Sequence, residues 1–176
     1  DGKCWMTKDL RIAGKTITPA DSDVASNYTI PASSINGFNY NNASNAYANS
    51  DSGFYNWYTA AVGTSTQDLF HHGQNTTVSI CPKGWRLPTG GNSGEFQALY
   101  NNYNSPLALR SSPVNLTLSG RVSSSSRDYQ GSNGYYWSST VYSDDDAYVL
   151  YLHTSVVYPA YHLERRLGLS VRCIAR

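Results

Sequence analysis

The chain has 176 residues, of which 40% are hydrophobic and 14% charged, and its formal net charge is +1. This length fits one domain with its own core. No apolar run reaches the roughly 20 residues of a membrane span, and no basic block suggests a surface that binds nucleic acid. The chain begins at Asp1 without an initiator methionine or a signal peptide, so we expect a processed or trimmed fragment.

The composition is rich in Ser (24), Asn (15), Tyr (15) and Gly (14) and poor in Glu (2) and Lys (4). Scarce Glu and Lys argue against a mainly helical protein, and Ser, Asn and Gly favour turns and loops. Tyr combined with Ser, Gly and Asn is also typical of antibody paratopes, where Tyr gives contact area at low entropic cost. The composition therefore favours a loop-rich extracellular β or α+β domain, with a binding module as the alternative.

The first half of the chain carries weak local patterns. Residues 5–12 read as a short strand or strand–turn, and residues 16–56 as long polar loops with scattered aromatic residues. Residues 55–62 are compatible with a short helix that ends at Gly63. Residues 71–80 read as a loop followed by a short strand.

The clearest helix begins after Pro88. Asn92 or Ser93 is a candidate N-cap, and Glu95 lies in the first turn, where a carboxylate interacts with the positive end of the helix dipole. Residues 104–106, Asn-Ser-Pro, end this helix. One apolar face is formed at positions i, i+3, i+4 and i+7 by Phe96, Leu99, Tyr100 and Tyr103.

The second half reads as β structure. Strands are predicted at 116–119, 135–140, 147–153 and 169–174, with a polar loop at 123–134. Helices in the first half and an antiparallel sheet in the second predict a single α+β domain over residues 1–176.

The three cysteines are Cys4, Cys81 and Cys173, and none forms a CxxC motif. A bond between Cys81 and Cys173 would tie the middle of the chain to its end. Closing so long a loop contributes on the order of 4 kcal/mol in the chain-entropy model. Cys4 would then pair outside this sequence. The alternative is three buried thiols.

Candidate catalytic and metal-binding patterns are incomplete. The acidic run 144–146 lacks the alternating spacing of a calcium loop, and the histidines at 71–72, 153 and 162 have no third ligand placed beside them. Ser139 lacks a G-x-S-x-G elbow, and no phosphate-binding glycine loop with its lysine is present. We therefore expect no enzyme activity, no metal and no cofactor.

Six stretches of the sequence carry a resemblance: DGKCWM (1–6) with Leu10, YNW (55–57), CPKGWRLPT (81–89), LSGR (118–121), YWSST (136–140) and LSVRC (169–173). In this order they resemble the Fibrobacter succinogenes major paralogous domain of bacterial surface and secreted proteins. The resemblance implies a C-type lectin-like fold of the formylglycine-generating-enzyme type, with two helices, small antiparallel sheets and many loops. It also places Trp5, Trp57, Trp85 and Trp137 in the scaffold, where we expect all four to be largely buried.

Two signatures of that fold are missing. The Glu-Pro-Asn, Gln-Pro-Asp and Trp-Asn-Asp motifs of calcium-dependent sugar binding do not occur. The C-terminal region holds Cys173 alone in place of the cysteine pair of the formylglycine-generating enzymes. Neither activity is expected here.

The segment 141–168 also resembles the variable region of proteins diversified by retroelements through adenine-directed mutagenesis. A regular framework alternates with an irregular mix of Tyr, His, Asp, Val and Leu, whose codons are all reachable from AAC by changing adenines. The framework residues are Ala147, Tyr148, Leu150, Leu152, Pro159 and Gly168. The residues that this resemblance assigns to ligand binding are Tyr142, Asp144, Asp145, Val149, Tyr151, His153, Val157, Tyr158, Tyr161, His162, Leu163 and Leu167.

Strand geometry orders part of this set. Because side chains alternate along a strand, positions 149, 151 and 153 should share an exposed face with a loop at 157–167, while Leu150 and Leu152 point into the core. The expected partner is a protein or a surface glycan, and the expected location is extracellular or on the cell surface. The alternative is a structural or adhesive surface domain without a diversified site.

Overall fold

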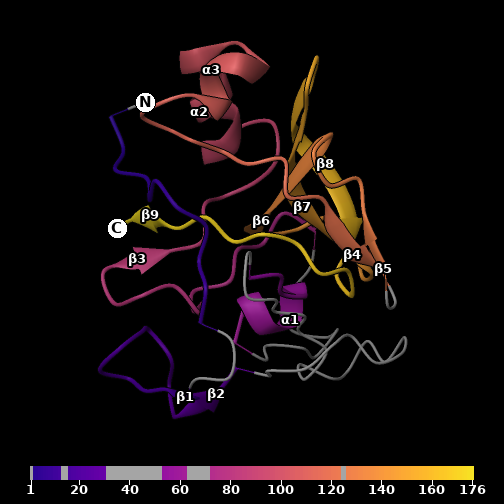
Figure 1. The fold of residues 1–176 in the computed structure, drawn as a ribbon. Coiled ribbons are helices and arrows are strands. Elements are labelled where there is room, and N and C mark those ends of the chain that lie inside the picture. The colour runs from indigo at the N-terminus through magenta and orange to yellow at the C-terminus, as the bar shows by residue number, and fades with distance from the viewer. Residues whose placement is uncertain (1, 13–15, 31–52, 63–71, 124–125) are drawn as a thin grey trace.

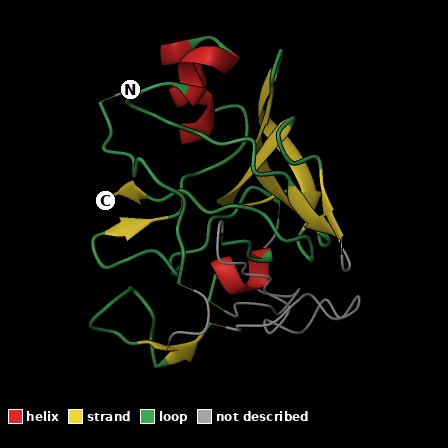
Figure 2. Ribbon diagram, in the orientation of Figure 1, coloured by secondary structure: helices red, strands yellow, loops and turns green. Residues whose placement is uncertain are grey.

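The computed structural model describes residues 2–12, 16–30, 53–62, 72–123 and 126–176. It is a mixed α+β structure with small antiparallel sheets (Figures 1 and 2), and the described part contains no helix that is long and apolar enough to span a membrane. The predicted polar loops at 31–52, the helix end at Gly63 and the candidate ligand His71 lie outside these residues. The elements are β1 (Thr16–Ile17), β2 (Tyr28–Thr29), α1 (Trp57–Ala60), β3 (Trp85–Arg86), α2 (Glu95–Tyr103), α3 (Pro106–Arg110), β4 (Arg121–Ser123), β5 (Ser126–Asp128), β6 (Asn133–Val141), β7 (Asp146–His153), β8 (Val157–Glu164) and β9 (Ile174–Ala175).

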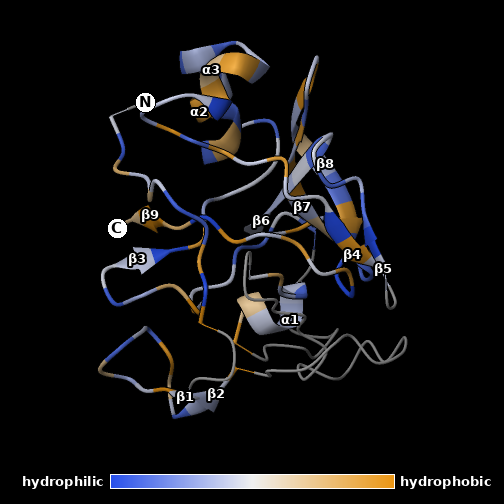
Figure 3. Ribbon diagram, viewed as in Figure 1, coloured by the Kyte–Doolittle hydropathy of each residue, from blue (hydrophilic) through white to orange (hydrophobic). Residues whose placement is uncertain are grey.

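The sheet β6-β7-β8 has three antiparallel strands and is the largest sheet among the described residues. Hydrophobic and hydrophilic residues are mixed along its strands (Figure 3). Every residue of β6 is buried. Because side chains alternate along a strand, the sheet separates two hydrophobic cores. One contains Trp137 and Val149 together with α1, and the other contains Tyr136 and Leu150 together with α2.

Three helices occur among the described residues, where the sequence indicated two. The additional helix, α3, has Ser105 as its N-cap, whose hydroxyl accepts a hydrogen bond from the Ala108 N–H at 3.0 Å. Only Asn104, in a left-handed conformation, and the N-cap Ser105 separate α2 from α3. The predicted end of α2 at 104–106 is therefore also the start of α3.

The N-terminus of α2 differs from the prediction. Its N-cap is Gly94, without a side-chain cap, and not Asn92 or Ser93. A Cβ at position 94 would lie 2.4 Å from the carbonyl oxygen of Gly90, which leaves room for glycine only. Glu95 pairs instead with the Arg86 guanidinium through two hydrogen bonds of 2.6 Å and so joins α2 to β3.

The chain ends are held beside the middle of the sequence. The predicted bond between Cys81 and Cys173 is present, with the two Cα atoms 6.0 Å apart, and β9 pairs with β3 just beyond it. Cys4 is exposed and forms no disulfide with either of them, so the alternative of three buried thiols is wrong.

Several expected elements are wrong. No strand forms at 116–119, and the predicted loop at 123–134 contains β5, the last residue of β4 and the start of β6. Residues 157–164 form the strand β8 and not a loop. Pro159 argues against a strand in the sequence, because proline cannot donate a ladder hydrogen bond and occurs mainly at bulges and sheet edges.

The expected burial of the tryptophans holds for two of the four. Trp57 and Trp137 are fully buried in the core beside α1. Their indole N–H groups donate to the carbonyl oxygens of Ser138 and Tyr55, at 2.9 and 2.7 Å. Trp5 and Trp85 are only half-buried, because they lie where the N-terminal segment and β3 meet β9 at the surface.

Candidate ligand-binding pocket

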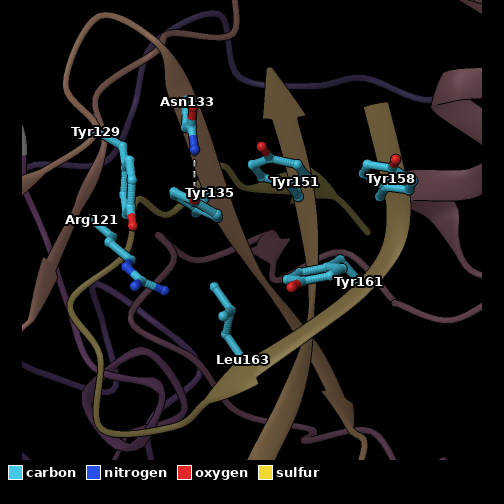
Figure 4. Close-up of a pocket in the computed structure, with 8 residues that line it drawn as sticks. All are labelled: Arg121, Tyr129, Asn133, Tyr135, Tyr151, Tyr158, Tyr161 and Leu163. Carbon is cyan, nitrogen blue, oxygen red and sulfur yellow. Dashed lines mark hydrogen bonds between the residues drawn. The ribbon is translucent and has the colours of Figure 1, made fainter. Parts of the chain in front are cut away.

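A pocket of about 550 Å³ opens beside the sheet, between β6-β7-β8 and the β4–β5 ribbon (Figure 4). We call its aromatic members, Tyr129, Tyr135, Tyr151, Tyr158 and Tyr161, the pocket cluster. The described residues that line the pocket are Arg121, Tyr129, Asn133, Tyr135, Tyr151, Tyr158, Tyr161 and Leu163.

Three of the tyrosines form a row across the three strands. Tyr135 pairs with Tyr151 in the β6–β7 register, and Tyr151 pairs with Tyr158 in the β7–β8 register. Neighbouring ring centres lie 5.0 and 5.7 Å apart, with interplanar angles of 26° and 9°. Both faces of the Tyr151 ring are therefore covered by its neighbours, so ring edges and hydroxyl groups remain for contact with a ligand.

A β-bulge in β8 adds Tyr161 to this row. Tyr151 is paired with Tyr158 and Val149 with Tyr161, so two residues along β7 correspond to three along β8. The extra residue reverses the alternation of side chains, and Tyr158 and Tyr161 consequently lie on the same face although they are three positions apart. Pro159 lies in this irregular stretch, where a missing N–H is tolerated.

The opposite wall comes from the β4–β5 ribbon and the turn that follows it. The guanidinium carbon of Arg121 lies 5.2 Å from the ring centre of Tyr129 and 5.9 Å from that of Tyr135, within the range of cation–π attraction. Tyr129 has φ of 61°, in the left-handed region. The Gly120 N–H donates to the carbonyl oxygen of Asn133 at 2.7 Å and fastens this wall to β6.

Two phenols of the pocket, those of Tyr135 and Tyr151, have a raised pKa. Burial raises the pKa of Tyr135, and this effect exceeds the opposing effects of the hydrogen bond from Asn133 and the charge of Arg121. Burial also raises the pKa of Tyr151, and the neighbouring Tyr158 and Tyr161 raise it further. These hydroxyl groups therefore keep their protons at neutral pH and can donate hydrogen bonds. The Tyr135 hydroxyl also accepts one from the Asn133 amide at 2.8 Å.

Four of the residues that the sequence assigned to ligand binding line this pocket: Tyr151, Tyr158, Tyr161 and Leu163. His153 lies at the end of β7, opposite Asn133 in the register, and its Nδ1 is 2.9 Å from the Ser155 hydroxyl in the following turn. Sequence reasoning missed four lining residues that precede the proposed variable segment. The four are Arg121, Tyr129, Asn133 and Tyr135.

The exposed face expected for position 149 is wrong. Val149 is 0% exposed, because the core beside α1 covers that part of the sheet face, and the pocket begins only two residues further along β7. Leu167 is likewise buried in that core. Val157 packs on the opposite face, against the core that contains Leu150 and Leu152. None of these three side chains is among the described residues that line the pocket.

The remaining predicted residues lie at the other end of the sheet. The ring of Tyr142 stacks on that of His162, and Asp144 and Asp145 lie in the exposed turn between β6 and β7. Buried Arg165 donates to the carbonyl oxygens of Ser143 and Asp144 and so holds this turn in place. Among the described residues, no group of three or more His, Cys, Asp and Glu side chains gathers as a metal site would require.

The chain was compared with models of known protein families, with curated proteins and with solved structures. None of the three comparisons finds a significant match.

Proposed function

We propose that this protein is a ligand-binding module of C-type lectin-like fold, displayed on a cell surface, whose segment 141–168 is diversified by a retroelement. The observation that carries the proposal is the pocket cluster. Five tyrosines from β6, β7, β8 and the turn after β5 converge on one hollow, and three of them come from the segment with the irregular residue mix.

The segment separates structural from accessible positions as a diversified site requires. Leu150, Leu152 and Pro159 are buried, whereas Tyr158 is 51% and Tyr161 43% exposed. Exposed positions of this kind accept substitution at little cost in stability. Aromatic residues in a pocket are also typical anchors of protein interfaces. The segment can therefore change its contact surface while its framework stays constant.

A scaffold that is independent of the contact surface supports the same proposal. The Cys81–Cys173 disulfide closes a loop with a sequence separation of 92 and stays clear of the pocket residues. Disulfides persist in oxidising compartments, which agrees with the proposed location outside the cell.

The proposal is tested by sequencing many copies of the coding segment from one population. Diversification predicts changes concentrated at positions 151, 158, 161 and 163, mostly at adenines of an unmutated template copy, with few changes at positions 150, 152 and 159. An even scatter of changes would support instead a structural or adhesive surface domain without a diversified site. Loss of pocket-dependent binding upon replacing Tyr158 and Tyr161 by Ser tests the binding function separately.

A further inference from the structure

The pocket has a cationic side chain that the proposed function does not use. Arg121 is the one charged residue among the described residues that line the hollow. Its guanidinium group lies over Tyr129 and Tyr135 (Figure 4), and its Nε is buried without a hydrogen-bond partner in the described part of the chain.

No carboxylate of the described residues neutralises this cation. Asp128 lies opposite Arg121 in the β4–β5 register, but its Oδ1 accepts a hydrogen bond from the Ser126 hydroxyl at 3.0 Å. The ion pairs within the described residues involve other arginines, Lys3 and His162, and do not include Arg121. The aromatic rings attract the cation but leave its N–H donors available.

On this basis we infer that the pocket binds a carboxylate-bearing segment of a protein, with Arg121 holding the carboxylate and the pocket cluster contacting the side chains around it. The inference rests on the proposed function and narrows its ligand. Arginine suits this role because its planar fork matches the two oxygens of a carboxylate. The protonated phenols beside it donate further hydrogen bonds to an anion.

The arrangement of the rings favours a protein over a sugar. A sugar stacks on an open aromatic face, but both faces of Tyr151 are covered by Tyr135 and Tyr158, and a face of Tyr129 is taken by Arg121. Ring edges and hydroxyl groups suit the mixed side-chain and backbone surface of a polypeptide.

Arg121 also lies outside the segment 141–168. Diversification of Tyr151, Tyr158 and Tyr161 would leave this cation in place. Variants with different contact residues would therefore share a requirement for an acidic group while they differ in the side chains that surround it.

The test uses a library of random peptides displayed on phage and selected against the intact domain. We expect selected peptides to be enriched in Asp and Glu, and one such peptide is then synthesised. Arg121→Gln should weaken its binding at least about tenfold, as loss of a charged hydrogen bond does. Replacing the acidic residue of the peptide by its amide should have a similar effect. The two changes together should weaken binding far less than the product of their separate effects, because they remove the same interaction.

Arg110→Gln is the control for net charge, because Arg110 is exposed at the end of α3, at a distance from the β4–β5 ribbon (Figure 1), and should leave binding unchanged. Peptides that lose binding with Tyr158→Ser and Tyr161→Ser but show no acidic enrichment and no response to Arg121→Gln would overturn the inference and leave the proposed function standing. Selection of no peptide through the pocket would overturn both. Arg121-dependent binding of uronic-acid oligosaccharides in place of peptides would overturn the assignment to a protein ligand.

Discussion

Two aromatic clusters lie on opposite faces of the same sheet, and one of them lines the pocket described above. The pocket cluster lines a hollow beside a cation. The second cluster, which we call the stacked cluster, consists of His72, Tyr142, Tyr148 and His162. In it the rings of Tyr142 and His162 lie 3.7 Å apart at 8°, and the His162 Nδ1 is 2.7 Å from the Asp146 carboxylate.

The two clusters differ in how far their contacts are already satisfied. A Cβ at Gly90 would lie 2.4 Å from the Cβ of Tyr148, so backbone packs directly against the stacked cluster. His162 has both a ring partner and a carboxylate partner. In the pocket, Arg121 has no carboxylate partner among the described residues. Aromatic residues in a sequence therefore indicate a binding site only where their edges and polar neighbours still lack partners.

The largest effect is expected beneath the pocket, on its own face of the sheet. Trp137 lies two residues from Tyr135 on β6 but is fully buried, and its indole N–H donates to the Tyr55 carbonyl oxygen at 2.7 Å. Trp137→Ala should lower the free energy of unfolding by roughly 3–5 kcal/mol, because it leaves a cavity in the core and removes the indole hydrogen bond. Urea denaturation followed by circular dichroism measures this. An unchanged midpoint would show that the buried and open parts of this face are not distinct.

A smaller effect is expected from the hydroxyl group of Tyr136, on the opposite face. It accepts a hydrogen bond from the Thr117 N–H at 2.6 Å and donates one to the Thr117 carbonyl oxygen at 3.0 Å. Tyr136→Phe should cost about 1–3 kcal/mol at neutral pH, because both groups of Thr117 lose their partner. Thermal unfolding of the two proteins side by side measures the loss.

The same residue makes stability depend on alkaline pH. Burial, reinforced by the nearby charge of Asp9, raises the pKa of Tyr136 far above its ordinary value of 10.0. Above about pH 10 the unfolded chain releases this proton while the native protein keeps it, so the free energy of unfolding falls as pH rises, by up to about 1.4 kcal/mol per pH unit. Tyr136→Phe should make this fall shallower. Equal slopes for the two proteins between pH 9 and 11 would contradict the assignment.

Much of this contrast could be foreseen from the sequence, and part could not. Alternation in β7 placed Leu150 and Leu152 in the core and Tyr151 on the other face, as the structure shows. The same rule failed for Val149, because alternation gives the face of a strand but not where the core beneath it ends. Alternation alone could not have placed Tyr158 and Tyr161 on one face, because a bulge adds a residue between them. Arg121 and Tyr129 could not be assigned, since only the tertiary fold brings the β4–β5 ribbon to the sheet.

For the stacked cluster we expect an effect of about 1 kcal/mol. His162→Ala removes the ring stack with Tyr142 and the hydrogen bond with Asp146, and each such contact at a partly exposed site is worth up to about 1 kcal/mol. His162→Phe is the matched control, because it keeps an aromatic ring and loses only the bond to Asp146. Urea midpoints should fall in the order parent, Phe variant, Ala variant. Peptide binding in the pocket should not change with either variant.

The smallest effect on stability is expected within the pocket cluster. Tyr158 and Tyr161 are about half exposed, and neither hydroxyl takes part in a hydrogen bond that the structure describes. Replacing both by Ser removes the Tyr158 ring, whose centre lies 5.7 Å from that of Tyr151, and exposes little buried area. The free energy of unfolding should therefore change by roughly 0.5 kcal/mol or less for each residue.

Leu150→Ser is the matched control, because it makes the same kind of change on the buried face of the adjacent strand and should destabilise the protein several-fold more. If the double Ser variant lost as much stability as Leu150→Ser, the pocket tyrosines would hold the sheet together as the buried leucines do. The segment could not then vary freely, and the division of the sheet into a fixed face and a contact face would fail. If the double variant unfolds at the same midpoint as the parent protein while Leu150→Ser unfolds earlier, the aromatic area of the pocket cluster does not serve the stability of the fold. A bound partner is the use of such area that remains.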